Sequence, residues 1–356
     1  MLRCRLAASS DDVSGKTSDP IVTTGSVPPQ VKIGLFLSAQ LEPGADPAAE
    51  VERLVEQATL AETLGFSSIF LGHHYLARSQ FLQPLSVVNH LAALTTDIRL
   101  GFGVYLLPLH NPLALAEELA STDVLSNGRL IVGVGAGYRE IEYAAFGVPY
   151  AERFKRLEES VAVMKRLWAG ERVSIDGYFG SLEQAEVLLR PLQPGGPPIW
   201  MGAFGPAGIR RAVRLNASWL APPDGDRGIL AERYTLYRGA LEEQGHGDGI
   251  EYPLMREAVV AGTREAALAV AGEYLVKQYA QYKSWSAAQA VDTEQLLNEF
   301  ALVGTPESVA ETLAWYRDEL GITEVILRLQ WVGMEHSAVI DSLRIIGEEL
   351  IGAVSA

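Results

Sequence analysis

The sequence is poor in cysteine. Cys4 is the only cysteine among 356 residues, so an intrachain disulfide and a cysteine-based zinc cluster are both excluded. Both absences fit a reducing compartment, and we expect a cytoplasmic protein.

Long apolar runs and an excess of positive charge are also missing. The longest apolar runs have the length of a strand, so the sequence predicts no transmembrane helix and no membrane partner. Lys and Arg number 29 against 44 Asp and Glu, for a net charge of −15. Together with the lack of a basic arm, this balance argues against nucleic acid as a partner.

The first 30 residues lack the apolar centre of a signal peptide. They are polar and rich in Ser, Asp and Pro, a composition that favours disorder. We therefore expect a disordered extension over 1–30 and one folded domain over 31–356.

Hydrophobic residues make up 48% of the chain, which is ample for a large core. Short apolar segments alternate along the chain with amphipathic segments of helix length. The short segments are apolar throughout and do not switch between apolar and polar residues. This pattern indicates strands that are covered on both faces, as in a parallel sheet. The predicted strands are 31–37, 68–71, 98–106, 130–134, 197–202, 217–220, 254–261 and 323–329. Eight such units predict an α/β fold, a (β/α)8 TIM barrel with insertions at 170–198 and 277–304; a doubly wound open sheet is the alternative.

Active sites of such barrels lie at the carboxyl ends of the strands. The rule selects the two histidines after the second predicted strand, His73 and His74, and the segments 103–106, 133–139 and 202–205. Adjacent side chains on an extended segment point to opposite faces, so one histidine can be structural while the other acts as a general acid or base with a pKa near neutrality. His90 and His110 fall on a helix and in a loop, without a clustered ligand pattern, so we predict no metal.

Two glycine-containing segments follow predicted strands. GVGAGY (133–138) would let a flat ligand or a phosphate approach the main chain, although a tight turn explains it equally well and its spacing does not favour a dinucleotide fold. GAFGPAGIRR (202–211) runs into a helix, whose first amides form an anion site. Arg210 and Arg211 could add charge there; an ordinary turn is the alternative.

Four segments carry a resemblance to a known family. They are AETLGFSSIFLGHHY (61–75), the stretch from TTDIRLGFGVYLLP to GVGAGY (95–138), PPIWMGAFGPAGIRRAVRLNASW (197–219) and VGTPESVAETLAWYRDELGITEVIL (303–327). Their order and spacing resemble the bacterial luciferase-like superfamily of flavin-dependent oxidoreductases, over about 31–351. The resemblance implies a (β/α)8 barrel, often dimeric, with FMN, or in one branch a deazaflavin coenzyme, at the carboxyl-end mouth.

The resemblance also implies roles for individual residues. His73 matches the histidine that acts as catalytic acid or base near the reactive edge of the ring, and Gly103–Val104 matches a non-prolyl cis peptide behind the ring. The remaining matches are cofactor-binding positions: Ala136, Gly137, Tyr138, Gly202, Ala203, Phe204 and Gly205.

The chain departs from luciferase itself at several of these places. Gly72 stands where a carboxylate often precedes the histidine pair, and Gly135, Ala136 and Gly205 replace a cysteine, an arginine and a serine. Aldehyde-dependent light emission is therefore not expected. Phosphate binding should depend more on main-chain amides, with Arg139, Arg210 or Arg211 as helpers.

The resemblance predicts a two-component monooxygenase. Reduced FMN from a separate flavin reductase would be used with O2 to oxygenate a small organic substrate, by a homodimer. The HHY sequence (73–75) favours FMN over the deazaflavin coenzyme. The alternatives are a deazaflavin-dependent hydride-transfer enzyme and a non-catalytic flavin-binding protein, the latter favoured by the missing carboxylate at Gly72. Substrate specificity is expected in 75–84 and in the two insertions.

Overall fold

The computed structural model describes residues 30–41, 44–77, 79–246, 249–283 and 292–355. The predicted disordered extension therefore lies, except for Gln30, outside the described residues.

A ten-stranded parallel sheet forms the centre of the molecule. Its spatial order is β11 (Ser218–Leu220), β10 (Ile199–Gly202), β7 (Leu130–Gly135), β5 (Arg99–Phe102), β3 (Ser68–Leu71), β1 (Lys32–Leu37), β14 (Glu324–Arg328), β12 (Pro253–Val260) and β13 (Leu302–Gly304), with β6 (Tyr105–Leu106) paired to β7. All residues of β3 and β7 are buried, as expected for strands with both faces covered.

The sheet is strongly curled. Next to β11, Ala221 forms an isolated parallel bridge with Leu254 of β12. The amide of Ala221 donates to the Pro253 carbonyl at 3.1 Å, and the amide of Met255 donates to the Ala221 carbonyl at 2.9 Å. The bridge joins the end of β11, at one edge of the sheet, to β12, which lies next to the strand at the other edge, so the carboxyl ends of the strands face a common space.

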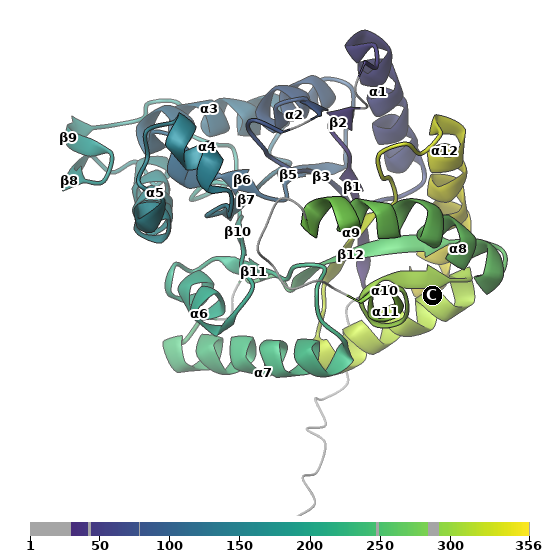
Figure 1. Cartoon of the computed structure of the whole chain (residues 1–356). Helices are drawn as coiled ribbons and strands as arrows, with labels where there is room; N and C mark the ends of the chain where they lie inside the picture. Colours follow the sequence, from purple (N-terminus) through teal and green to yellow (C-terminus); the bar gives the residue numbers. More distant parts are fainter. Residues whose placement is uncertain (1–29, 42–43, 78, 247–248, 284–291, 356) are drawn as a thin grey trace, which may run out of the picture.

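Helices surround this sheet (Figure 1). They are α1 (Pro47–Thr63), α2 (Pro84–Ala92), α3 (Pro112–Leu125), α4 (Glu140–Ala145), α5 (Arg153–Trp168), α6 (Pro206–Arg214), α7 (Arg227–Gln244), α8 (Arg264–Val270), α9 (Val276–Lys283), α10 (Thr293–Gln295), α11 (Pro306–Leu320), α12 (His336–Ile345) and α13 (Gly352–Ser355). Two 3-10 turns are Leu107–Leu109 and Tyr150–Glu152, and three π-helical turns are Ala271–Leu275, Leu296–Phe300 and Ile346–Ile351.

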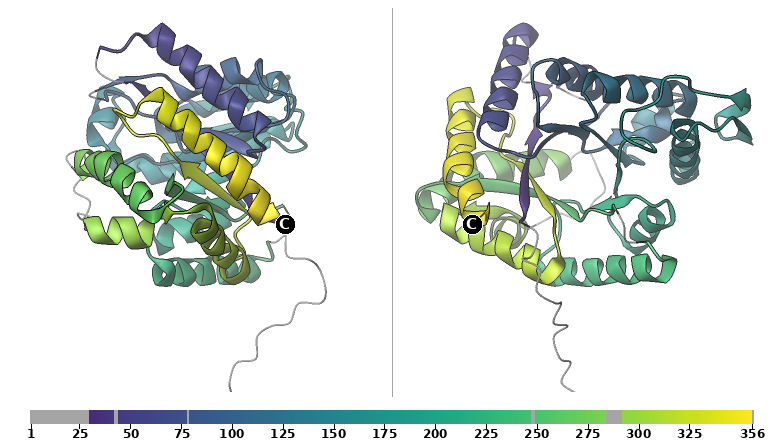
Figure 2. Two further views of the ribbon diagram at one scale, coloured as in Figure 1. Left: turned by 90° about the vertical axis from the view of Figure 1, so that its right-hand side faces the viewer. Right: turned by 180° about the vertical axis from the view of Figure 1, so that it is seen from behind.

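Several helices begin with a capping residue followed by proline, which suits the first helical position because it needs no amide partner there. Asn111 accepts from the amides of Leu113 and Ala114 at the start of α3, and Thr305 caps α11. Helices α1 and α12, from opposite ends of the sequence, run side by side (Figure 2).

Each of the eight predicted strands is present at its predicted position, with one correction, although the sheet also contains strands that were not predicted. The segment 98–106 is not one strand. It forms two strands, β5 and β6, which are separated by Gly103 and Val104. The peptide bond between these residues is cis, as the resemblance implied.

The insertions contain structure that periodicity did not predict. The antiparallel hairpin β8 (Val173–Gly177) and β9 (Gly180–Ala185) lies within 170–198. The insertion 277–304 ends in β13, which extends the sheet beyond β12. In the segment 75–84, β4 (Gln80–Phe81) pairs with β2 (Gln40–Leu41). These strands are two to six residues long, too short for a clear periodic signal.

Candidate functional site

A cavity of about 1660 Å³ lies at the carboxyl ends of the strands. All predicted site residues line it: His73, Gly103, Val104, Ala136, Gly137, Tyr138, Gly202, Ala203, Phe204 and Gly205. They come from the ends of β3, β5, β7 and β10, which are neighbours in the sheet. The structure thus brings together residues that are up to 132 positions apart (205 − 73).

The ring of Phe36 lies against the ends of β3 and β5. A Cβ atom built on Gly72 would be 3.2 Å from Cζ of Phe36, and one on Gly103 would be 3.2 Å from Cε2 of the same ring. A carboxylate side chain at position 72 would have to displace this ring. The departure noted at Gly72 therefore has a steric explanation.

Val104, which follows the cis peptide bond, projects over two glycines. A Cβ on Gly202 would be 2.8 Å from Cγ1 of Val104, and a Cβ on Gly135 would overlap Cγ2. These glycines of β10 and β7 provide the space that the Val104 side chain occupies in the cavity wall. Phe36 and Val104 together give the cavity an apolar inner surface.

His73 is buried, with 3% of its surface exposed. The amide of Leu106 donates to its Nδ1 at 3.2 Å. Because Nδ1 is the acceptor, the neutral ring carries its proton on Nε2. Among the described residues, Nε2 has no hydrogen-bond partner, so this N–H is available to a ligand in the cavity.

Burial lowers the pKa of His73 to about 3, with a further contribution from His110, while the nearby Gln83 side chain, which does not reach hydrogen-bond geometry with Nε2, opposes the shift. Burial also lowers the pKa of His110 to about 4; its ring lies 5.5 Å from that of His73. The prediction of a near-neutral pKa for His73 is therefore wrong. This histidine is a neutral hydrogen-bond donor at physiological pH.

The second histidine, His74, contacts a carboxylate from another element. Glu142 of α4 is 1% exposed, and its Oε1 lies 3.2 Å from Nδ1 of His74. The same oxygen accepts from the amide of Tyr75 at 3.0 Å and from Nη1 of Arg139 at 3.0 Å. Arg139 also donates to the carbonyls of Tyr75 (2.7 Å) and Leu76 (3.1 Å).

Glu142 was missed by sequence reasoning. It is 68 positions beyond His74, in a six-residue helix that was not predicted. One signal was available in the sequence: Glu142 is an acidic residue that follows the GVGAGY segment closely, and this segment was predicted to lie at the same edge of the sheet as the histidines.

The loop after β10 forms one end of the cavity. Gly205 is the N-cap of α6 and has no side-chain capping bond, and nothing lies within 4 Å of a Cβ built on it. The indole N–H of Trp219 donates to the Ala203 carbonyl at 2.9 Å and fixes the loop. An open helix N-terminus of this kind, beside small residues, suits an anionic group.

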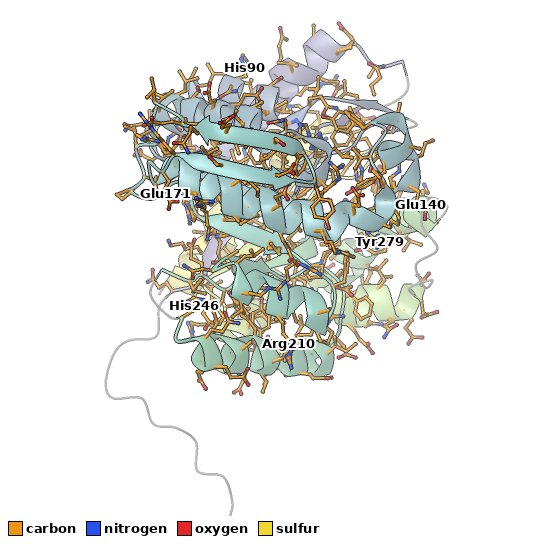
Figure 3. The ribbon with its side chains drawn as sticks, turned by 90° about the vertical axis from the view of Figure 1, so that its left-hand side faces the viewer. His90, Glu140, Glu171, Arg210, His246 and Tyr279 are labelled. Carbon is orange, nitrogen blue, oxygen red and sulfur yellow. The ribbon has the colours of Figure 1, made fainter. Side chains whose placement is uncertain are left out.

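The arginines proposed as phosphate helpers differ in their surroundings. Arg139 is bound to Glu142 and to carbonyl groups. Arg210 is exposed on α6 and does not line the cavity (Figure 3). Arg211 lines the cavity but forms an ion pair with Glu158 at 2.6 Å.

A further cavity-lining cation, Arg153, was not singled out from the sequence. Its guanidinium lies over the rings of Tyr150 (3.9 Å) and Phe154 (4.3 Å), and it has no carboxylate partner in the described part of the chain. Arg211 lies 4.5 Å from the same Phe154 ring, which places the start of α5 beside α6. Arg153 is thus a cation at the anion-binding end whose charge is not neutralised by an acid.

The β12 and β14 side of the cavity is also polar. Buried Glu257 accepts from Nη2 of Arg328 (2.9 Å), from the indole of Trp331 (3.0 Å) and from the hydroxyl of Tyr279 (3.3 Å). The side chain of Gln278, on α9, is 5% exposed, and its Nε2 has no hydrogen-bond partner among the described residues. These groups could orient a polar substrate across the cavity from the glycine-rich loops.

Two searches of the described residues gave negative results. No group of three or more His, Cys, Asp or Glu side chains could hold a metal ion. No helix in this part of the chain is long and apolar enough to cross a membrane.

Comparison with known proteins places this geometry in context. The family model described as luciferase-like monooxygenase matches residues 31–324. An uncharacterized protein of Sinorhizobium fredii is 35% identical over 219 residues, which is 61% of each chain. The F420-dependent glucose-6-phosphate dehydrogenase of Microbacterium testaceum is 27% identical over 325 residues, covering 84% of this chain and 92% of that protein.

The crystal structure of monooxygenase RslO1 from Streptomyces bottropensis has a TM-score of 0.83 and 27% identity. The superposition covers 90% of this chain and 99% of RslO1. The fold therefore has a counterpart among solved structures.

Proposed function

The chain belongs to the luciferase-like monooxygenase family, and we propose from this premise that it is the oxygenase component of a two-component FMN-dependent monooxygenase. A separate flavin reductase would supply reduced FMN, and O2 would be used to oxygenate a small organic substrate. The likeness to monooxygenase RslO1 supports an oxygenase, and the HHY sequence (73–75) favours FMN over the deazaflavin coenzyme.

The proposal includes a closed (β/α)8 barrel, supported by the bridge between Ala221 and Leu254. It also includes a homodimer in the cytoplasm, in line with the family resemblance and the single cysteine. The active site is the cavity at the carboxyl ends of the strands.

The residues present fit a flavin nucleotide. The first amides of α6, with Gly205 open to the cavity, and the Arg153 guanidinium would hold the phosphate. Phe36 and Val104 would back the flat ring, since the glycines beside them leave room for a close approach. When bound, reduced flavin supplies the electrons that activate O2.

The chain's own residues then have distinct tasks. The Nε2–H of His73 would donate a hydrogen bond to an acceptor atom at the ring edge, from a position fixed by the Leu106 amide. The apolar cavity wall would limit access of water. The side chains of Gln278 and Arg328, on the β12 and β14 side of the cavity, would orient the substrate.

The observation that carries the proposal is a cavity in which three groups meet: a helix N-terminus without a side-chain cap, an arginine and a buried N–H donor, the last two without an acidic or hydrogen-bond partner, respectively, among the described residues. A dry apolar pocket with a few converging polar groups is the usual form of a cofactor site.

A deazaflavin-dependent hydride-transfer enzyme is the second candidate. It is favoured by the similarity to an F420-dependent glucose-6-phosphate dehydrogenase over 84% of the chain. The same phosphate end of the cavity would hold either cofactor.

Anaerobic binding titrations with reduced FMN and with reduced deazaflavin coenzyme test the proposal. We expect tighter binding of reduced FMN; tighter binding of the deazaflavin coenzyme would favour the second candidate, and binding of neither rejects both. Oxygen uptake with a reductase, measured across a substrate panel, then distinguishes an oxygenase from a non-catalytic flavin-binding protein, which would give no substrate-dependent uptake.

A further inference from the structure

We propose that His74 and Glu142 form the proton-accepting pair of this site, and that His73 serves beside them as a fixed hydrogen-bond donor. The inference rests on the proposed function, because it concerns proton transfer at the same cavity. It reverses the roles that the sequence suggested for the two histidines.

The hydrogen bonds of Glu142 determine which nitrogen of His74 carries a proton. Oε1 already accepts from the Tyr75 amide and from Arg139, so it is an acceptor for all its neighbours, as expected for an ionised carboxylate. Nδ1 of His74, at 3.2 Å, must then be the donor. In the neutral ring the basic nitrogen is consequently Nε2.

The two histidines differ in burial and in the group that lies at Nδ1. His73 is almost fully buried, accepts from a main-chain amide at Nδ1 and has no carboxylate partner among the described residues. His74 lines the cavity, has a side chain that is 22% exposed and holds a carboxylate at Nδ1. A carboxylate at Nδ1 stabilises the imidazolium ion that forms when Nε2 accepts a proton, and His73 has no such carboxylate partner among the described residues.

Several elements pack around the His74 ring. The segment that leads into α4 and α4 itself place Glu142, Arg139 and Tyr138 there, and the Tyr138 ring lies 6.0 Å from that of His74 in an edge contact. His73 and Tyr75 belong to its own segment, and Phe81 of β4 lies 5.8 Å away. Glu142 is an acidic group in hydrogen-bond contact with the ring, and Arg139 holds Glu142 in place.

The proposed step is a simple proton transfer. An acidic O–H of the bound substrate breaks, its electron pair stays on the oxygen, and its proton forms a new bond to Nε2 of His74. The imidazolium ion keeps its Nδ1–H bonded to Glu142. His74 is the catalytic residue in this step, and Glu142 is a positioning residue that also stabilises the charge.

Nitrogen-15 NMR of the histidine-labelled full chain tests the geometry without relying on activity. We expect the neutral His74 ring to be protonated on Nδ1 and the His73 ring on Nε2. A neutral His74 protonated on Nε2 would overturn the proposal. Since this measurement needs no cofactor, it separates a failure of the pair from a failure of the FMN assignment.

The variant Glu142→Gln keeps the size of the side chain and removes its charge. We expect mixed tautomers of His74 and a fall in kcat of about 10- to 100-fold, with little change in KM. Glu140→Gln, on the same helix, is the matched control and should leave the His74 tautomer unchanged. A His74 ring that keeps the wild-type tautomer in Glu142→Gln contradicts the proposal; if that variant does not fold, the wild-type tautomer decides.

Discussion

At the scale of single residues, the site is determined by which polar atoms have partners within the protein. His73 accepts at one nitrogen from the Leu106 amide and presents the other to the cavity. A buried donor without a partner costs free energy, so a bound acceptor would be stabilised there.

Changing His73 to alanine removes this donor. We expect kcat to fall about 100- to 1000-fold, by analogy with the loss of one preorganised donor, while the affinity for reduced FMN changes little because the phosphate is held elsewhere. Single-turnover rates and anaerobic titration of the two proteins measure both quantities.

The variant His73→Gln serves as the comparison, since its amide can still donate a hydrogen bond. It should retain more activity than His73→Ala. Equal turnover in the wild type and in His73→Ala would exclude the role assigned to this residue.

Arg153 is the residue on which we expect phosphate affinity to depend. A charge-assisted hydrogen bond contributes about 1.5–3 kcal/mol, so Arg153→Ala should weaken FMN binding about 10- to 100-fold. Riboflavin, which lacks the phosphate, should bind the variant and the wild type equally. Equilibrium titration with the two flavins measures the difference.

Arg210→Ala provides the matched control for Arg153→Ala. It removes the same charge from the neighbouring helix, but Arg210 is exposed and does not line the cavity, and the affinity for FMN should be unchanged. An equal loss of riboflavin and FMN affinity in Arg153→Ala would show that the arginine supports the fold of the cavity and not the phosphate.

At the scale of elements, the cavity depends on glycines at strand ends. In β7, Gly135 leaves room for Val104, and a Cβ at that position would overlap the valine. In contrast, a Cβ on Gly205 would meet nothing within 4 Å, and its φ of −140° is accessible to any residue.

These two glycines predict a matched pair of stability changes. Gly135→Ala should lower the free energy of unfolding by about 1–3 kcal/mol through overpacking, whereas Gly205→Ala should be within about 0.5 kcal/mol of the wild type. Urea unfolding followed by circular dichroism measures both. Equal stabilities would mean that Val104 can move aside without cost.

The regular elements could be predicted from the sequence because each strand is a continuous apolar run and each long helix has an apolar face. The end-of-strand rule then located the cavity residues from His73 to Gly205. The partners of these residues could not be predicted in the same way. Glu142 reaches His74 through a six-residue helix. Arg153 differs from Arg156 and Arg211 because it forms no ion pair with a described carboxylate.

The burial of His73 was equally invisible in the sequence. Its low pKa arises from the packing of Tyr75, Tyr105 and His110 around the ring, at centroid distances of 4.7, 4.4 and 5.5 Å. Tyr75 belongs to the same segment as His73, whereas Tyr105 and His110 belong to a second segment that reaches the ring only in the folded chain. The motif gave the position of the histidine, and the surrounding packing determines its protonation state.

At the scale of the whole molecule, the buried histidines make the stability dependent on pH. The pKa values of His73 and His110 in the folded protein are about 3 and about 4, whereas an unfolded chain has histidine pKa values near 6.5. Between about pH 4 and pH 6.5 the unfolded state therefore binds more protons. The free energy of unfolding must fall as the pH is lowered through this range.

Each of the two histidines contributes a slope of up to about 1.4 kcal/mol per pH unit. We expect the urea midpoint to decrease steadily from pH 7 to pH 4.5. His110→Phe keeps an aromatic ring between Tyr75 and Tyr105 but cannot be protonated, so about half of this contribution should disappear. His90→Gln, at an exposed position on α2 (Figure 3), should leave the slope unchanged. If the His110→Phe and wild-type proteins lose stability equally on acidification, protonation of His110 does not cause the fall in the free energy of unfolding at low pH. The carboxylates then become the groups to examine.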